Sequence, residues 1–417
     1  MKRLWLFYFP LLFMPNVGFS HQTEFGVLEI SDWLIVPFIV FLAIAPSAKY
    51  EQRISKMNTL LWGFLIWALL TTLSIHFRYE YLDDVPILVS CCLKLGKFVL
   101  YVIPGILIAR KLSDARVRGE WLWSLLAALF MLSMGLLASR GDPGAQPSDA
   151  LEGYKSYNAI IVSMAILCAY IAGLWIDNVG SRRWSRCAGI VVLFAVCSVL
   201  VSSSLSNHGR GGWIAFAMGF GYILWKRTQT LKTAAIILML GLASLAAYEI
   251  LPNFKSVVNL TISPAEDAQF QSVDDGARFS TWAHEAPKFV NAPLWGTGFF
   301  HRGGVSGLWD TGSHNFFLQM FLETGVVGGV LLILIFALTW RQAGLVAASQ
   351  NKTSVATRAA LLTAIVGGMS GEYYYGGVSV LVLFAVFAIA GSLPAVEVVF
   401  MTDKAHSQFL RWRQVAS

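Results

Sequence analysis

The sequence predicts an all-α fold, a polytopic membrane bundle of about twelve transmembrane helices with one long polar loop. Of the 417 residues, 56% are hydrophobic and 13% are charged, whereas soluble proteins average roughly 25% charged residues. The mean hydropathy is +0.61. Apolar windows near the roughly 20 residues needed to cross a bilayer recur along the whole chain. We therefore expect residues 1–417 to form one integral membrane domain.

Twelve apolar windows give the expected spans. The first contains Pro10 and Pro15, and we interpret it as a short membrane helix; a secretory signal cleaved after Ser20 is the alternative. In both cases His21 emerges on the outer side. The expected spans are 4–19, 33–48, 59–77, 86–109, 121–138, 157–176, 187–204, 211–224, 233–250, 316–338, 359–371 and 375–400.

Lysine and arginine are distributed asymmetrically between the connections. Alternate connections and the two termini hold 21 of the 31 basic residues, while the intervening segments are rich in acids. The positive-inside rule then places both termini in the cytoplasm and the long 251–315 loop outside. The basic segments are Lys2/Arg3, Lys49/Arg53/Lys56, Arg110/Lys111/Arg116/Arg118, Arg182/Arg183/Arg186, Lys226/Arg227/Lys232, Arg341/Lys352/Arg358 and Lys404/Arg411/Arg413.

The same observations disfavour several classes of protein. The net charge of +7 resides mainly in short inter-helix connections, which does not indicate nucleic-acid binding. The sequence contains no Walker motif, so the chain is not an ATP-driven pump by itself. The five cysteines lie inside or at the edge of apolar spans without metal-ligand spacing, so we predict neither zinc nor a disulfide.

Arg210 runs against the positive-inside bias, because it lies at the outer face in a glycine-flanked turn between two spans. Glycines let the backbone approach a ligand closely, and an arginine fork binds phosphate oxygens in pairs. The functional interpretation is therefore an anion site. The alternative is an interfacial arginine whose side chain reaches toward lipid headgroups.

The 251–315 loop is the one long segment that faces water. Arg278 lies early in an expected short helix, with Asp274 or Asp275 as its N-cap and Trp282 about one turn later. A solvated amphipathic helix is the alternative. The two acid pairs of the loop, Glu266/Asp267 and Asp274/Asp275, are expected to be solvated rather than to hold a divalent ion.

His314 and Asn315 stand at the entry to the next span, and Glu323 follows between two and three turns later. Histidine is the side chain best suited to proton transfer near neutral pH. A glutamate inside a membrane usually faces a cavity or a partner. The alternative for His314 is a helix cap.

Lys94 and Lys97 lie three residues apart on one face of the span 86–109. Two lysines within a membrane span imply a polar cavity or an anionic ligand. Alternatively, this part of the span lies at the membrane interface.

These motifs follow one another in a defined order. In chain order they are Tyr157-Asn158, the Gly-Arg-Gly turn at Arg210, Arg278 with Trp282, Trp295-Gly296-Thr297-Gly298, His314-Asn315 and Glu323-Thr324-Gly325. This order resembles the bacterial O-antigen ligase and polymerase superfamily, most clearly between about residues 190 and 335. The chain departs from the commonest pattern in having His208-Gly209 where a serine often precedes the arginine.

The resemblance implies an all-helical enzyme on the periplasmic face of the bacterial inner membrane. Such an enzyme transfers a glycan from an undecaprenyl-diphosphate carrier to an acceptor hydroxyl. No metal, nucleotide or other cofactor is implied, because the lipid diphosphate is the leaving group. Arg210 and Arg278 match arginines that hold the diphosphate, and His314 matches the histidine that activates the acceptor. The expected substrate-binding residues are Asn315, Trp282, Lys94, Lys97, Tyr157, Asn158 and Glu323.

Two functional alternatives accompany this reading. A ligase, whose acceptor is the lipid A core, is favoured over a polymerase, whose acceptor is another carrier-linked repeat unit. From a different class comes a secondary transporter or flippase. It is disfavoured because the last six spans do not repeat the first six and the polar residues gather on one face. The expected partners are thus the lipid-linked glycan, its acceptor and membrane lipids, and not nucleic acid.

Overall fold

The computed structural model shows eleven helices and one small β-hairpin within the residues that it describes. Those residues are 3–14, 21–23, 26–28, 30–45, 52–78, 85–112, 115–138, 157–176, 181–205, 210–226, 289–290, 292–299, 315–344, 351–369, 371, 374 and 377–392. The elements are α1 (Leu4–Leu11), β1 (His21–Thr23), β2 (Gly26–Leu28), α2 (Ile30–Ile44), α3 (Gln52–Arg78), α4 (Val85–Lys111), α5 (Ala115–Ala138), α7 (Tyr157–Ile176), α8 (Arg182–Leu205), α9 (Arg210–Trp225), α12 (Phe316–Gly344), α13 (Asn351–Met369) and α14 (Gly377–Ser392).

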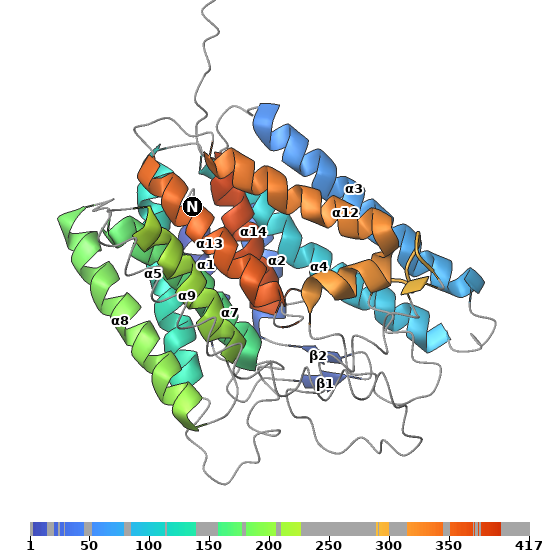
Figure 1. Ribbon diagram of the computed structural model, residues 1–417, viewed down its shortest axis with the longest axis horizontal. Helices are drawn as coiled ribbons and strands as arrows, with labels where there is room; N and C mark the ends of the chain where they lie inside the picture. Colours follow the sequence, from blue (N-terminus) through green and yellow to red (C-terminus); the bar gives the residue numbers. More distant parts are fainter. Residues whose placement is uncertain are drawn as a thin grey trace, which may run out of the picture.

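Each of these helices overlaps one of the spans expected from the sequence, and together they form a bundle (Figure 1). The all-helical fold class is thereby confirmed for the described part of the chain. The expected span 233–250 and loop residues 251–288 lie outside it. Five helices contain an apolar stretch of 18 residues or more, in α3, α4, α5, α7 and α12. The count of twelve spans and the side of the membrane stay predictions.

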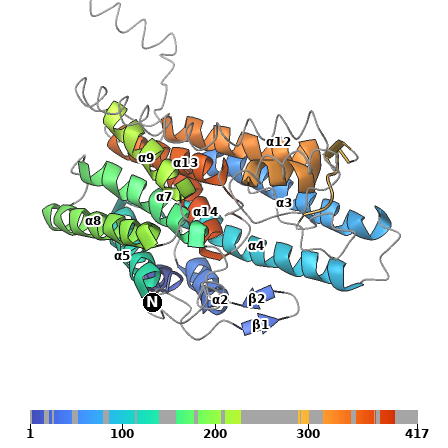
Figure 2. The same ribbon diagram turned by 60° about the horizontal axis from the view of Figure 1, so that its bottom comes forward.

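A short β-hairpin was not expected from the sequence. β1 pairs antiparallel with β2 between α1 and α2, with His21 opposite Leu28. Figure 2 shows it beside α2, at the edge of the bundle. On the same side α1 packs against α5, where the rings of Phe9 and Trp121 lie 4.5 Å apart. Arg3 at the start of α1 forms an ion pair with Glu120 of α5.

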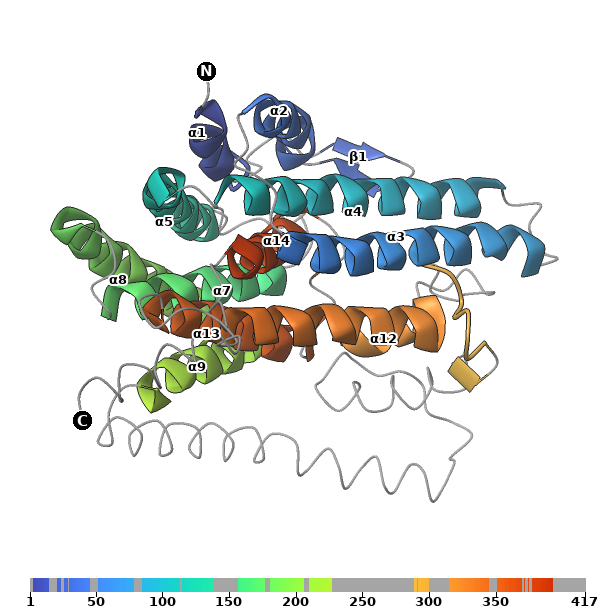
Figure 3. The ribbon, with the colours of Figure 1, turned by 90° about the horizontal axis from the view of Figure 1, so that it is seen from above.

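The helices α7 and α14 form the centre of the bundle (Figure 3). Both are apolar around their whole circumference, as expected for helices buried on all sides. In α7, 83% of the stretch Ala159–Ile176 is buried, and in α14 every residue of 379–390 is buried. α14 packs against α4 and α7, while α13 packs against α7 and α9. The outer helices instead expose leucines, as a lipid-facing surface requires.

Small residues allow the central helices to approach closely. A Cβ added to Gly105 of α4 would lie 2.6 Å from the Cβ of Phe384 in α14. A Cβ on Gly173 of α7 would lie 2.8 Å from the Cα of Ala356 in α13. Close backbone approach through small residues is the usual packing mode of membrane helices. In lipid no hydrophobic force drives helices together, so their association depends on close packing.

The expected span 316–338 is not one continuous helix. Gly325 has φ +67° and ψ −173°, so α12 consists of a short segment, 316–324, and a long segment, 326–344. The rings of Phe317 and Phe336 lie 5.3 Å apart. In a continuous helix these residues would be roughly 28 Å apart, at 1.5 Å per residue. The two segments therefore fold back toward each other at an acute bend (Figure 1).

Candidate functional site

The starts of α7, α9, α12 and α14 and the end of α13 meet at one end of the bundle. A Cβ on Gly212 of α9 would collide with Ile161 of α7. A Cβ on Gly367 of α13 would lie 2.6 Å from Val162 of α7. α7 also reaches the start of α14, where Ser379 is buried. The structure thus brings together helix starts that carry several predicted site residues.

Arg210 is the first residue of α9, and Tyr157 and Asn158 are the first two residues of α7. The side chains of all three lie outside what the structure describes. Their backbone positions are informative, because a helix N-terminus stabilises an anion and disfavours a cation. The backbone of Arg210 thus lies at a helix N-terminus, and anion binding by its side chain stays a prediction.

Asn315 caps the short segment of α12. Its side-chain oxygen accepts hydrogen bonds from the backbone amides of Phe317 (3.0 Å) and Leu318 (3.1 Å), the standard pattern of an N-cap. The amide of Phe316 donates to the carbonyl of Gly371 at 3.2 Å, which ties this helix start to the end of α13. The preceding residue, His314, lies outside the described residues, but the cap fixes the point at which the chain leaves it.

A segment that precedes α12 closes the break at Gly325. We call residues 292–299 the strap. Buried backbone groups in a membrane need hydrogen-bond partners from the protein because lipid offers none. At this break the strap supplies them. The bonds are Thr297 N to Leu322 O (2.8 Å), Gly298 N to Glu323 O (2.9 Å) and Val326 N to Pro293 O (2.8 Å).

Two glycines permit this contact. Gly296 and Gly325 both have φ +67°, a region that favours glycine. A Cβ on Gly296 would lie 2.5 Å from the carbonyl of Glu323, and a Cβ on Gly325 would collide with the carbonyl oxygen of Leu294. The two sequence motifs Trp295-Gly296-Thr297-Gly298 and Glu323-Thr324-Gly325 are therefore the two sides of one contact.

Aromatic side chains anchor the strap to α3 and α4. Trp295 stacks on Trp67 of α3, with ring centres 4.7 Å apart, and the Trp67 indole N–H donates to Thr324 O at 2.7 Å. Phe299, at the end of the strap, is fully buried and lies 5.3 Å from the ring of Phe98 in α4. The strap thus ties the loop that leads into α12 to the helical framework.

Glu323 lies directly before the break and is 1% exposed. Its carboxylate accepts a hydrogen bond from the Gln319 side chain at 2.8 Å, which offsets part of the free energy of burying it. Cys91 of α4 lies within electrostatic range of both Glu323 and Lys94. Lys94 is exposed, one turn after Cys91 in α4.

Lys97, one turn after Lys94, forms an ion pair with Asp32 of α2 at 2.6 Å. Tyr101, one turn further along α4, donates to the other Asp32 oxygen at 2.7 Å, and Ser31 lies 2.7 Å from the Tyr101 hydroxyl. The Asp32 side chain is only 10% exposed, so its charge is compensated inside the bundle. Substrate binding by Lys97 stays a prediction, and any such contact would share the ammonium with Asp32.

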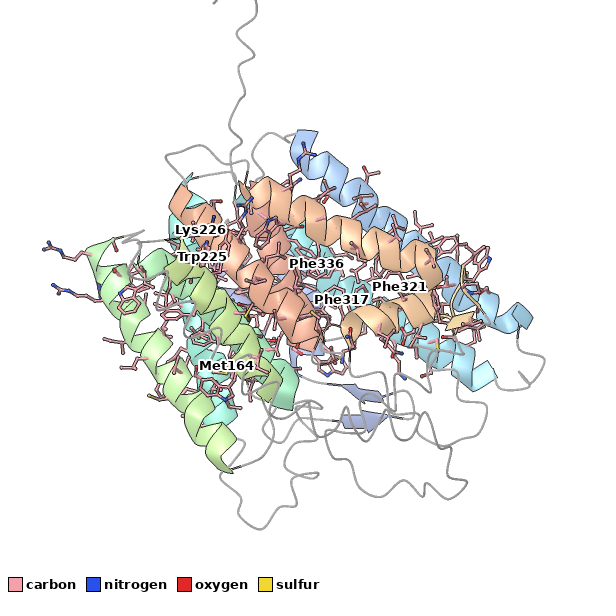
Figure 4. All side chains as sticks on the ribbon, in the orientation of Figure 1. Met164, Trp225, Lys226, Phe317, Phe321 and Phe336 are labelled. Carbon is pink, nitrogen blue, oxygen red and sulfur yellow. The ribbon has the colours of Figure 1, made fainter. Side chains whose placement is uncertain are left out.

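An apolar groove lies between α7, α8 and α9, next to the start of α9. It is a shallow groove of about 270 Å³, a volume that includes space open to the surroundings, and Gly212 and Trp213 of α9 lie in its wall. Met164 contributes to its wall from α7 (Figure 4). Its full lining is Ile161, Met164, Ala165, Cys168, Ala195, Val196, Val199, Gly212, Trp213 and Phe216. Every lining residue is apolar, which suits a hydrocarbon chain.

The remaining predicted residues are not described. Arg278, Trp282 and His314 lie outside the described residues, and so do both acid pairs of the loop. Among the residues that the structure does describe, no three His, Cys, Asp or Glu side chains gather as metal ligands would.

Several contacts were missed by sequence reasoning. Lys97 forms an ion pair with Asp32, which also accepts a hydrogen bond from Tyr101. Gln319 donates to Glu323, and Trp67 donates to the carbonyl of Thr324 beside the break in α12. Helical spacing gave a signal for two of these residues. Tyr101 lies four residues after Lys97 in α4, and Gln319 lies four residues before Glu323 in α12. Trp67 and Asp32 reach across from other helices, and one sequence gives no sign of those distant pairings.

Residues 204–333 match the family model described as O-antigen ligase. The matched range includes Arg210, the strap and the break in α12, and it covers less than half of the chain. No curated protein matches the chain. The family match confirms the resemblance and supports a membrane glycosyltransferase of the O-antigen ligase superfamily.

Proposed function

We propose that this protein transfers a glycan from an undecaprenyl-diphosphate carrier to an acceptor hydroxyl, that of the lipid A core, on the periplasmic face of the inner membrane. The observation that carries the proposal is the O-antigen ligase match over residues 204–333. The convergence of the starts of α7, α9 and α12 beside an apolar groove supports it.

The donor would lie with its isoprenoid chain in the groove and its diphosphate at the start of α9. Gly212 lies in the wall of this groove, two residues after Arg210 in the sequence, so both belong to the first turn of α9. Arg210 and Arg278 then hold the diphosphate oxygens. As the diphosphate leaves, it gains negative charge, and fixed guanidinium groups stabilise that charge strongly in a site with little water.

The acceptor would be activated by His314. The imidazole takes the proton of the acceptor hydroxyl while its oxygen attacks the anomeric carbon of the glycan. The bond between that carbon and the diphosphate oxygen breaks, and the bonding electron pair leaves with undecaprenyl diphosphate. The Asn315 cap and the strap support this role, because they fix the chain on both sides of the segment that carries His314.

Purified protein supplied with carrier-linked glycan and candidate acceptors tests the proposal, with EDTA present and nucleotide absent. We expect product from the wild type and none from Arg278→Ala or His314→Ala. Arg278→Lys should restore little activity, since a point charge lacks the guanidinium fork. Lys255→Ala, in the same loop, is the matched control and should transfer normally.

The acceptor used distinguishes the two enzymes of this superfamily. Transfer to lipid A core identifies a ligase, and transfer to a second carrier-linked repeat unit identifies a polymerase. Wild-type transfer by Arg278→Ala would contradict the role given to that residue. Protein that binds the carrier lipid, forms no product with any acceptor and moves substrate across liposome membranes would support a flippase instead.

A further inference from the structure

Two cations and two aromatic rings form a continuous row at the opposite end of the bundle. The Lys226 ammonium lies 5.8 Å from the centre of the Tyr222 ring, and the Arg358 guanidinium carbon lies 5.1 Å from that of Trp340. The rings of Tyr222 and Trp340 meet edge to face, with centres 5.6 Å apart. We call these four residues the cation–aromatic row. It joins the C-terminal ends of α9 and α12 to the first half of α13, and Figure 4 shows Lys226 with Trp225 at this end of α9.

Arg358 is held in place within this row. Its Nε donates to the backbone oxygen of Trp340 at 3.3 Å, and its side chain is half-buried. The guanidinium lies directly on Gly344, where any Cβ would collide with it. Fixing a long side chain loses rotamer entropy, and burying a charge loses hydration. An anion bound to the free edge of the fork would offset both losses.

Among the described residues, no acidic side chain forms an ion pair with the row. Among the described residues the ion pairs are Arg3–Glu120 and Lys97–Asp32, and neither involves the row. The sequence supports the same point, because residues 226–233 and 340–358 contain no Asp or Glu. The basic residues in these two segments are Lys226, Arg227, Lys232, Arg341, Lys352 and Arg358. These two segments are therefore basic and contain no acid.

We infer that the cation–aromatic row binds the phosphate of an anionic phospholipid headgroup in the cytoplasmic leaflet. The positive-inside rule assigns this end of the bundle to the cytoplasm. Basic pockets between transmembrane helices on that side bind such headgroups, and an arginine fork binds phosphate oxygens in pairs. The two rings suit the headgroup level of a membrane, where tyrosine and tryptophan concentrate.

Native mass spectrometry of the delipidated, purified full chain tests this inference. The probes are phosphatidylglycerol, cardiolipin, phosphatidylcholine and inorganic phosphate. We expect the two anionic lipids to bind and the other two probes not to bind at the same concentration. Arg358→Gln and Lys226→Gln should each weaken phosphatidylglycerol binding about fivefold. Arg183→Gln, an exposed change at the same end on α8, is the matched control and should leave binding unchanged.

The outcomes separate the sources of phosphate. Equal binding of phosphatidylcholine and phosphatidylglycerol would overturn the inference, and so would equal weakening by Arg183→Gln and Arg358→Gln. Tight binding of inorganic phosphate would identify a soluble ligand and exclude the lipid. Arg358→Gln keeps a polar side chain over Gly344, and thermal unfolding without lipid checks its fold. Lys226 is exposed, so Lys226→Gln carries the test independently of that check.

Discussion

Asn315 caps α12 with its side chain and directly follows His314, the predicted catalytic residue. A change at Asn315 can therefore affect both stability and transfer. Asn315→Ala removes both capping bonds and should lower stability by about 1 kcal/mol. Glycan transfer should fall by a larger factor than this loss implies, since the chain next to His314 loses its fixed attachment. Thermal unfolding and transfer assays measure the two effects.

Asn315→Asp is the matched control, because a carboxylate oxygen caps a helix as well as an amide oxygen does. It should keep both stability and transfer. Unchanged transfer by Asn315→Ala, in protein that unfolds at a lower temperature, would show that the cap does not position His314.

Variants of the ion pair between Lys97 and Asp32 distinguish a structural role of Lys97 from a substrate-binding role. Lys97→Met leaves a nearly buried carboxylate without its cation and should destabilise the protein by about 1–3 kcal/mol. This is less than for a fully buried pair, because 28% of the Lys97 side chain is exposed. Adding Asp32→Asn removes the orphaned charge and should restore most of the lost stability, as measured by thermal unfolding.

Transfer by the paired variant then addresses the sequence prediction. If Lys97 also binds substrate, the paired variant should remain deficient in transfer although its stability has returned. Wild-type transfer by the paired variant would assign Lys97 a purely structural role. Lys94→Met is a useful companion, because Lys94 is exposed and its loss should change transfer more than stability.

At the scale of elements, the strap and the break in α12 depend on one another. Gly296→Ala places a Cβ 2.5 Å from the Glu323 carbonyl and imposes an unfavourable φ. It should destabilise the protein by roughly 2 kcal/mol or more. Gly63→Ala in α3 is the matched control, since no heavy atom lies within 4 Å of its added Cβ. Because alanine favours helix, the control should be neutral or stabilising by up to about 1 kcal/mol.

Thermal unfolding of the two glycine variants provides the comparison, and transfer assays show whether the strap matters for function. Equal stability of Gly296→Ala and Gly63→Ala would contradict the tight contact between the strap and α12. A variant that is destabilised but transfers at the wild-type rate would limit the strap to a structural role.

The helices could be predicted from the sequence and the break could not, for physical reasons. A membrane helix is specified locally, by a window apolar enough to cross lipid, so α7 coincides with its expected span and α14 lies within its own. The break depends on a contact between residues 292–299 and α12, and the glycines at 325, 328 and 329 fit close packing equally well. For the candidate site, the expected span 316–338 placed Asn315 at the helix entry, where the structure has it as the cap, while its substrate-binding role stays a prediction.

At the scale of the whole molecule, the two ends of the bundle differ in chemistry. One end gathers the starts of α7, α9 and α12, the apolar groove and the strap. The other carries the cation–aromatic row and two basic segments, 226–233 and 340–358, that contain no Asp or Glu. A transferase that meets its lipid donor on one face needs only one such site, whereas a transporter needs a polar path between both faces. The central helices α7 and α14 have no charged residue and bury only Ser163 and Ser379 as polar side chains, which favours the one-sided arrangement.

The expected orientation, with both termini and the basic connections in the cytoplasm, predicts which positions face outward in intact cells. After the five native cysteines are replaced, Ser272→Cys in the 251–315 loop should react with a membrane-impermeant maleimide added from the periplasm. Ser349→Cys, in the connection between α12 and α13, should react only after the membrane is opened, because basic connections are retained in the cytoplasm. A C-terminal tag should likewise be reached only after opening. Labelling of Ser349→Cys from outside would invert the bundle and place the Arg210 end in the cytoplasm, where carrier-linked glycan awaiting transfer to lipid A core is not presented.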